Sequence, residues 1–184
     1  MTKTAARIMR LMDRAVTAWQ LPVIGREKGR PLRRLLERHR PRRGVEVGSL
    51  FGYSAILIAS SLPRGGRLTC VEQNPFLAWM VEANVGQAGL GDRVTVVAGD
   101  ALRMLPRLRG PVDFVFIDAE KDEYLRYLRA VEPRLTTGAL VVADNTGISR
   151  REVRPYLAHV RGAAYESREH DFGFDCMEVS VYRG

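Results

Sequence analysis

The stretch Gly44-Val-Glu-Val-Gly-Ser-Leu-Phe-Gly-Tyr-Ser-Ala-Ile56 decides the fold of this chain. A short apolar run reaches Gly48, a second glycine follows at Gly52, and small and apolar residues then begin a helical pattern. Glycine is needed where the backbone takes a positive φ or where a ligand comes close to it. The first N–H groups of a helix also lack intrahelical partners. The stretch therefore predicts a strand, a tight turn and a helix start that together cradle a cofactor.

The carboxylate of Glu46, just before the first glycine, indicates which cofactor. A dinucleotide fingerprint reads Gly-x-Gly-x-x-Gly and aims a helix N-terminus at pyrophosphate, whereas this turn reads Glu46-x-Gly48-x-x-x-Gly52. A carboxylate here would repel pyrophosphate and suits a cationic ligand, such as the amine of S-adenosylmethionine. A second apolar run at 68–71 ends in Glu72, where an acid can accept hydrogen bonds from ribose hydroxyls. An ordinary βα turn with solvated acids is the alternative.

Length and composition predict one globular domain over residues 1–184. The chain is 46% hydrophobic and 27% charged, and a chain of this length buries a proper core. No apolar run approaches the roughly 18 residues of a membrane span, and the Arg-rich N-terminus lacks the features of a secretory signal. We therefore expect a cytoplasmic protein without membrane contact. Cys70 and Cys176 match no metal spacing, so free thiols are expected.

The charge balance is strongly basic. The formal net charge is +8, which suggests anionic partners or simply solubility. Arginine outnumbers lysine 26 to 3, so each lysine merits inspection. The densest basic patch runs from Arg30 to Arg43. A solvated helix face is favoured over a nucleic-acid surface, because no aromatic residues interleave to stack bases.

Alternating strand and helix patterns predict a doubly wound α/β sheet. Runs such as Phe114-Val-Phe-Ile117 are apolar on both faces, as buried parallel strands must be. The expected strands are 45–48, 67–72, 93–97, 112–117 and 138–144, followed by a hairpin of 163–169 and 175–182. The expected helices are 4–18, 31–39, 52–61, 75–88, 101–107, 121–132 and one near 150–160.

Acidic and amide side chains follow the expected strands, where ligands bind in open α/β sheets. Besides Glu46 and Glu72 these are Asp100, Asp118, Asp144 and Asn145. Strand ends collect turn-forming Asp and Asn in any case, yet all five consecutive strands carry an acid in or beside their ends. The last three residues supply hard oxygen ligands without sulfur or imidazole, a set that suits Mg²⁺ better than zinc.

Lys121 lies three residues beyond Asp118, about one helical turn along the chain. Lysine, unlike arginine, can lose its proton and act as a base. An ordinary surface lysine in the charged segment 120–123 is the alternative interpretation. If Lys121 is functional, it is the general base of a reaction beside the metal.

These residues resemble the motifs of the metal-dependent class I S-adenosylmethionine O-methyltransferases, and among them most closely the catechol O-methyltransferases. The matching segments are 46–54, Glu72, 116–121 and 143–145. The similarity extends to Lys28-Gly29, to 156–162 and to 175–184, about 160 residues in all. It implies a Rossmann-like, seven-stranded sheet with an antiparallel last strand. It also implies that the helices within residues 1–43 cover the cofactor and substrate site.

The resemblance assigns a role to each matching residue. It implies that Asp118, Asp144 and Asn145 bind Mg²⁺, that Lys121 is the general base, and that Lys121 and Asn145 face the substrate. Glu169 matches a family glutamate near the second substrate hydroxyl, and Trp19 an upstream wall residue, offset by one position. The implied S-adenosylmethionine contacts are Glu46, Gly48, Ser49, Gly52, Tyr53, Ser54, Glu72, Gln73, Asp100, Ala101 and Asp118.

The resemblance implies Mg²⁺-dependent transfer of the methyl group of S-adenosylmethionine to a hydroxyl of a catechol-like small molecule, by a monomer or homodimer. Ala119-Glu120 replaces the His-Trp of animal catechol enzymes, and Cys176 replaces a family glycine, so the substrate pocket differs. One alternative is methylation of a hydroxylated uridine in tRNA, with the Arg30 to Arg43 patch on phosphates. Another is a cofactor-binding domain without catalysis, against which the intact metal ligands and Lys121 argue.

Overall fold

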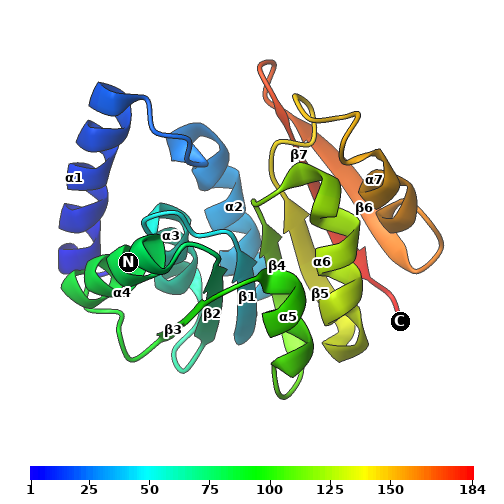
Figure 1. Cartoon of the computed structure of the whole chain (residues 1–184), viewed down its shortest axis with the longest axis horizontal. Coiled ribbons are helices and arrows are strands. Elements are labelled where there is room, and N and C mark those ends of the chain that lie inside the picture. The colour runs from blue at the N-terminus through cyan, green and yellow to red at the C-terminus, as the bar shows by residue number, and fades with distance from the viewer.

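A computed structural model describes all residues from 1 to 184. Its single sheet has seven strands in the order β3-β2-β1-β4-β5-β7-β6, as Figure 1 shows. The five strands β1 to β5 are parallel, and β7 pairs antiparallel with both β5 and β6. The strands are β1 (Arg43–Val47), β2 (Arg67–Glu72), β3 (Val94–Ala98), β4 (Val112–Ile117), β5 (Leu135–Ala143), β6 (Tyr165–Asp171) and β7 (Cys176–Tyr182). The predicted fold class, strand count and antiparallel last strand are confirmed.

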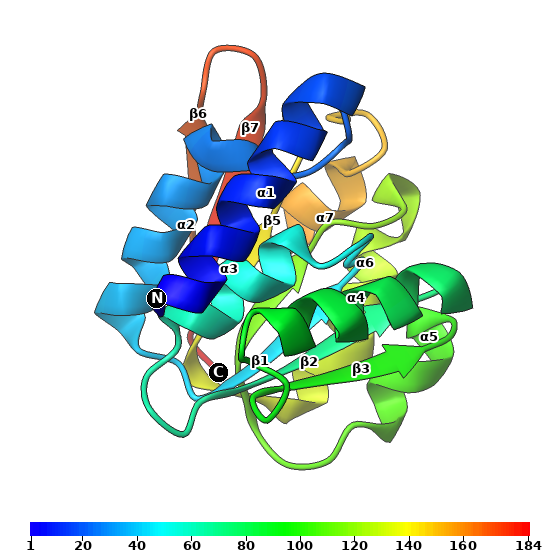
Figure 2. The same ribbon diagram turned by 90° about the vertical axis from the view of Figure 1, so that its left-hand side faces the viewer.

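Helices cover both faces of this sheet (Figures 1 and 2). One face carries α1 (Lys3–Trp19), α2 (Gly25–His39), α3 (Tyr53–Ser61) and α4 (Pro75–Gln87); the other carries α5 (Ala101–Met104), α6 (Tyr124–Val131) and α7 (Arg154–Val160). Short 3-10 turns lie at Leu105–Arg107, Lys121–Glu123 and Glu132–Arg134. None of the helices is long and apolar enough to cross a bilayer.

The central strands are buried on both faces, which explains their continuous apolar runs. Phe114 and Phe116 of β4 pack into the core beneath α1 to α4, whereas Val115 and Ile117 pack into the core beneath α5 to α7. Successive side chains of a strand point to opposite faces, so both faces must be apolar. Such a sheet leaves its polar groups at the strand ends.

Helix α2 differs most from its predicted bounds. It begins at Gly25 and not at Pro31, which lies inside it. Proline in a helix interior removes one hydrogen bond, and here burial of the preceding turn accompanies that loss. Lys28 and Gly29 are buried, and a Cβ at Gly29 would lie 2.8 Å from Leu57 Cδ1. The first turn of α2 is therefore fixed by tertiary contacts that local propensity does not reveal.

Two other helices, in contrast to α2, begin later than predicted. The segment expected at 121–132 opens with the 3-10 turn that contains Lys121, and α6 proper starts at Tyr124. The helix expected near 150–160 starts at Arg154. The predicted hairpin is confirmed, since β6 and β7 pair antiparallel from Tyr165 with Tyr182 to Asp171 with Cys176.

Gly48, at the end of β1, is required by the backbone itself. Its φ is +81°, and an added Cβ would lie 2.3 Å from the carbonyl oxygen of Asp118. Gly65 has nearly the same φ, +80°, but an added Cβ there would meet nothing within 4 Å. Gly48 therefore lets the ends of β1 and β4 approach each other.

We predict that Gly48→Ala lowers the free energy of unfolding by about 3 kcal/mol or more, because left-handed strain adds to a backbone clash. Gly65→Ala is the matched control and should cost only about 1 kcal/mol, the strain alone. Chemical denaturation of both variants measures the difference. Equal losses at the two positions would contradict the close approach at Gly48.

Candidate functional site

A cavity of about 480 Å³ opens at the carboxyl ends of β1, β2, β4 and β5. This is the edge at which open α/β sheets bind ligands. The structure brings eleven of the predicted site residues into its lining. They are Gly48, Ser49, Tyr53, Ser54, Glu72, Gln73, Ala101, Asp118, Lys121, Asp144 and Asn145.

The carboxylate of Glu72 fixes the loop after β1. Its Oε2 accepts hydrogen bonds from the backbone N–H groups of Ser49 and Leu50, both at 3.0 Å, and its Oε1 accepts one from Asn74 at 3.0 Å. Leu50 has a φ of +49°, which is uncommon for a non-glycine residue. Glu72 therefore holds the cofactor loop in shape and also presents a carboxylate to the cavity.

Glu46 lies beneath this loop and is fully buried. Its Oε2 accepts hydrogen bonds from Ser49 Oγ at 2.8 Å and from Cys70 Sγ at 3.0 Å, while its Oε1 has no partner. Burial raises the pKa of Glu46 to about 7, and the nearby charge of Asp118 adds to the rise. An unpaired buried carboxylate oxygen is costly. Glu46 does not line the cavity, so a cationic group bound at the loop would lower this cost through its charge and not through direct contact in this structure. The residues present therefore fit the ammonium and sulfonium charges of S-adenosylmethionine.

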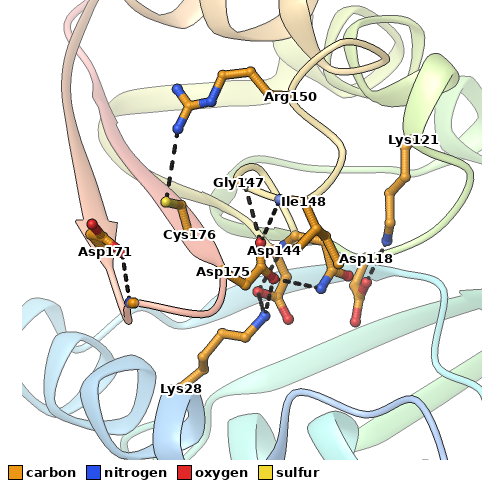
Figure 3. Close-up of polar contacts among 12 residues, drawn as sticks. Lys28, Asp118, Lys121, Asp144, Gly147, Ile148, Arg150, Asp171, Asp175 and Cys176 are labelled. Atoms are coloured by element: carbon orange, nitrogen blue, oxygen red, sulfur yellow. Dashed lines mark hydrogen bonds and ion pairs between the residues drawn. The ribbon is translucent and has the colours of Figure 1, made fainter.

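A buried lysine joins α2 to the ends of β5 and β7. Lys28 Nζ donates to Asp144 Oδ1 at 2.5 Å and to Asp175 Oδ2 at 2.7 Å, as Figure 3 shows. Burial alone would lower the pKa of Lys28, but the two carboxylates outweigh it and the pKa is raised. Asp175 is also buried, yet its hydrogen bonds from Lys28 and from the Ile148 amide lower its pKa to about 2. All three groups are therefore charged at neutral pH in this arrangement.

Asp175 also organises the loop that follows β5. Its Oδ1 accepts hydrogen bonds from the amides of Gly147 and Ile148, and its Oδ2 accepts one from Asn145 Nδ2 at 2.8 Å. Asn145 has a φ of +56°, a conformation that asparagine tolerates better than most residues. Because its amide nitrogen is engaged, its carbonyl oxygen is left to accept a ligand.

Lys121 reaches the cavity from the 3-10 turn after β4. Its Nζ donates to Asp118 Oδ1 at 2.8 Å and to the hydroxyl of Tyr124 at 2.9 Å. The Tyr124 hydroxyl in turn donates to the backbone carbonyl of Asp144 at 3.1 Å. One short chain of hydrogen bonds thus connects Lys121 to the ends of both β4 and β5. Figure 3 shows the first of these contacts, between Lys121 and Asp118.

The acids at the ends of β4 and β5 have the chemistry of a hard cation site. Burial, and then repulsion by Asp118, raise the pKa of Asp144 to about 6 despite its contact with Lys28. A cation between the two carboxylates would relieve this repulsion. No cluster of three or more His, Cys, Asp or Glu side chains gathers in this protein, so the candidate set is two carboxylates plus the Asn145 carbonyl. Such a set leaves positions for water and substrate and fits Mg²⁺.

Sequence reasoning missed the roles of Lys28 and Asp175. Lys28 is one of only three lysines, and that scarcity was the available signal. The two residues are 147 positions apart, so no local pattern pairs them.

Two predicted substrate residues are not brought to the site. Glu169 lies on β6, where it forms ion pairs with Arg150 at 2.7 Å and with Arg161 at 2.9 Å. Arg161 also binds the buried Glu178, which is the partner of Glu169 on the neighbouring strand β7. Trp19 ends α1 with 78% of its surface exposed. Neither residue lines the cavity, so the structure does not bring them together with the other predicted site residues.

Asp100 and Gly52 support the site without lining it. Asp100 caps α5 by accepting a hydrogen bond from the Leu102 amide at 2.8 Å, and this capping presents Ala101 to the cavity. Gly52 has a φ of +95° and begins α3 against Val81.

The fold and the strand-end residues together define a Rossmann-like protein with a cofactor loop beside a candidate cation site. A family model described as O-methyltransferase matches residues 5–153. The chain therefore belongs to the O-methyltransferase family.

Known relatives agree with this assignment. The chain is 34% identical to the catechol O-methyltransferase of Sus scrofa over 88% of this chain and 93% of that protein. It is 37% identical to that of Mycobacterium tuberculosis over 71% of this chain and 61% of that protein. The chain spans less than two thirds of several curated relatives, including 48% of the Niastella koreensis enzyme.

Solved structures confirm the fold. The O-methyltransferase TomG of Streptomyces achromogenes, solved in complex with SAM, has a TM-score of 0.84 and 25% identity, over all of this chain and 91% of that chain. The O-methyltransferase of Bacillus cereus, solved in complex with SAH, has a TM-score of 0.83 and 23% identity, over all of this chain and 92% of that chain.

We predict that Glu46 makes the unliganded protein less stable as the pH rises. Its pKa is about 7 in the fold and near its ordinary value when unfolded. The folded state therefore binds the extra proton between about pH 4.5 and 7, and stability is lost across that window. As the pH rises from 5 to 8, the free energy of unfolding of Glu46→Gln should increase by about 3 kcal/mol relative to that of the wild type.

Urea denaturation at several pH values measures this gain. The exposed Glu82 offers the control Glu82→Gln, which should follow wild type at every pH. Parallel curves for wild type and Glu46→Gln would contradict the buried, unpaired state of Glu46.

Proposed function

We propose that this protein transfers the methyl group of S-adenosylmethionine to a hydroxyl of a catechol-like small molecule, with the help of a divalent cation. The observation that carries the proposal is the convergence of three groups of residues in one cavity: the glycine loop after β1, the acids after β4 and β5, and Lys121. A methyl donor, an oxygen nucleophile and a base are the parts that such a transfer needs.

Different residues of this chain would bind the methyl donor and the cation. The loop of Gly48 to Ser54 and the carboxylates of Glu46 and Glu72 would hold the donor, which supplies an electrophilic methyl on a sulfonium. Asp118, Asp144 and Asn145 would hold the cation, which lowers the pKa of hydroxyls bound to it. Both sets belong to adjacent strand ends, so donor and acceptor would meet in one orientation, and such orientation lowers the barrier.

Lys121 would take the proton of the attacking hydroxyl. As the oxygen forms its bond to the methyl carbon, the carbon–sulfur bond breaks and the sulfonium becomes a neutral thioether. Tyr124 and Asp118 position the Lys121 amine from both sides. Val23, Ile24 and Ile148 line the same cavity and would keep water from the reacting atoms.

Two alternatives keep part of this assignment. Methylation of a hydroxylated uridine in tRNA would use the same donor and cation sites, and the Arg30 to Arg43 patch would bind the phosphates of the tRNA. Binding of tRNA should then weaken steeply as the salt concentration rises. A domain that binds the donor without catalysis would show no transfer to any acceptor. The packing of Lys121 against Asp118 favours catalysis over this second alternative.

We predict that labelled S-adenosylmethionine transfers its methyl group to a catechol in the presence of Mg²⁺ and that a chelator stops the transfer. Lys121→Gln should lower kcat by about 10²- to 10⁴-fold, the usual contribution of a general base, and leave S-adenosylhomocysteine binding unchanged. Lys3→Gln is the matched control, because Lys3 is an exposed lysine remote from the cavity lining.

Bulk tRNA is assayed beside the catechol. Methyl transfer that persists in the presence of a chelator would contradict a role for the cation. A wild-type kcat in Lys121→Gln would contradict the role of Lys121 as the general base. Transfer to tRNA alone would establish the RNA alternative.

A further inference from the structure

A second cavity, of about 1070 Å³, adjoins the first. It lies between α1, the start of α2, the loop after β5 and the tip of the β6–β7 hairpin, and Figure 2 shows these elements at one end of the molecule. The two cavities share Val23, Ile24, Asn145 and Ile148. An acceptor whose hydroxyls lie at Asn145 would therefore have room to extend the rest of its body into the second cavity.

The apolar part of this second cavity suits an aromatic ring. Phe174, at the hairpin tip, and Ile148, after β5, both line it and are 57% and 67% exposed. Exposed large apolar side chains around a concave site are typical of a ligand-binding pocket.

The charged part of the lining is not balanced. Arg26 is neutralised by Asp13 through two hydrogen bonds of 2.9 and 2.7 Å, and Lys28 by Asp175 at 2.7 Å. Arg10 and Arg14 also line the cavity, and neither takes part in any of the ion pairs of the protein. They face a single unpaired carboxylate of the lining, Glu27. Lys28 is also paired with Asp144 at 2.5 Å, so the positive charge left without an ion pair is that of the two arginines at the rim of the cavity.

Arg10 and Arg14 are both exposed, and both belong to α1. They lie four residues apart on α1, so they project from the same side of that helix. Asp13, between them, accepts hydrogen bonds from the Tyr53 hydroxyl at 2.8 Å and from Arg26. Helix α1 is thus tied both to the first residue of α3 and to α2, which places the backbone of Arg10 and Arg14 beside the cavity that they line.

We propose that the methyl acceptor carries an anionic group, a carboxylate on the side of the ring away from its hydroxyls, and that Arg10 and Arg14 bind it. This inference rests on the proposed function for the position of the hydroxyls. Guanidinium groups bind carboxylates through paired, charge-assisted hydrogen bonds. The two arginines are therefore specificity-determining residues for an acidic catechol.

The test compares 3,4-dihydroxycinnamate with its neutral amide, which differs only at the charged group. The acid should show a kcat/KM about three- to fivefold higher than the amide, mainly through KM, as expected for an ion pair at an exposed rim. The variant with Arg10→Gln and Arg14→Gln should lose this advantage for the acid and leave the amide unchanged. Arg7→Gln is the control, an exposed arginine of α1 outside both cavities.

Calorimetric binding of the acid and the amide to the protein loaded with S-adenosylhomocysteine and Mg²⁺ provides a second readout, independent of turnover. Tighter binding of the acid that weakens with salt and disappears in the double variant supports the inference. Equal binding of the two compounds, or an equal loss for both in the double variant, overturns it. Methyl transfer to the amide as efficient as to the acid overturns this inference alone, whereas no transfer to either compound would oppose the proposed function.

Discussion

The buried ammonium of Lys28 is the constraint on which the site depends. It lies between Asp144 and Asp175, which come from strand ends that are far apart in the sequence. Removing one partner of a buried ion pair costs about 3–5 kcal/mol, because it leaves an uncompensated charge. The contact therefore fixes the first turn of α2 over the carboxyl edge of the sheet. It also fixes Asp175, whose second oxygen arranges the loop at Gly147 and Ile148.

The electrostatics of the site follow from this arrangement. Lys28 and Lys121 are two of the three lysines of the chain, and each contacts one of the two acids of the candidate cation site, Asp144 and Asp118 respectively. Lys28 compensates Asp144 only in part, since the pKa of that acid remains raised to about 6. Glu46 is raised as well, to about 7. A cavity with surplus negative potential at its floor suits both a sulfonium donor and a divalent cation.

Positive charge gathers at the other end of the same space. The N-terminal helices bring Arg10 and Arg14 to the outer cavity, while the acids stay at the strand ends. An elongated molecule with hydroxyls at one end and an anionic group at the other matches this gradient. Under the proposed function, the N-terminal helices would contribute to the acceptor side of the site as well as covering the sheet.

The sheet could be predicted from the sequence because its signals are local. Apolar runs such as Phe114 to Ile117 mark strands buried on both faces, and Gly48 marks the turn that lets β1 approach β4. Most of the strand-end residues followed from that topology. The start of α2 did not, because Pro31 indicates a helix start whereas tertiary contacts extend the helix back to Gly25.

Long-range pairing limited the prediction of the site. The partner of Lys28 is 116 residues away in Asp144 and 147 away in Asp175, and only the folded sheet brings them together. The position of Glu169 depends on long-range pairing as well, because the register of β6 and β7 sets it beside Arg161.

The central claim is that Asp118, Asp144 and Asn145 hold one hard dication beside the donor loop. Electron paramagnetic resonance of Mn²⁺, titrated into the protein loaded with S-adenosylhomocysteine, measures it directly. The account predicts one bound ion per chain and an affinity at least about tenfold weaker in Asp118→Asn, which removes a charged ligand. An absence of bound Mn²⁺ in the wild-type protein, or an unchanged affinity in the variant, would contradict it.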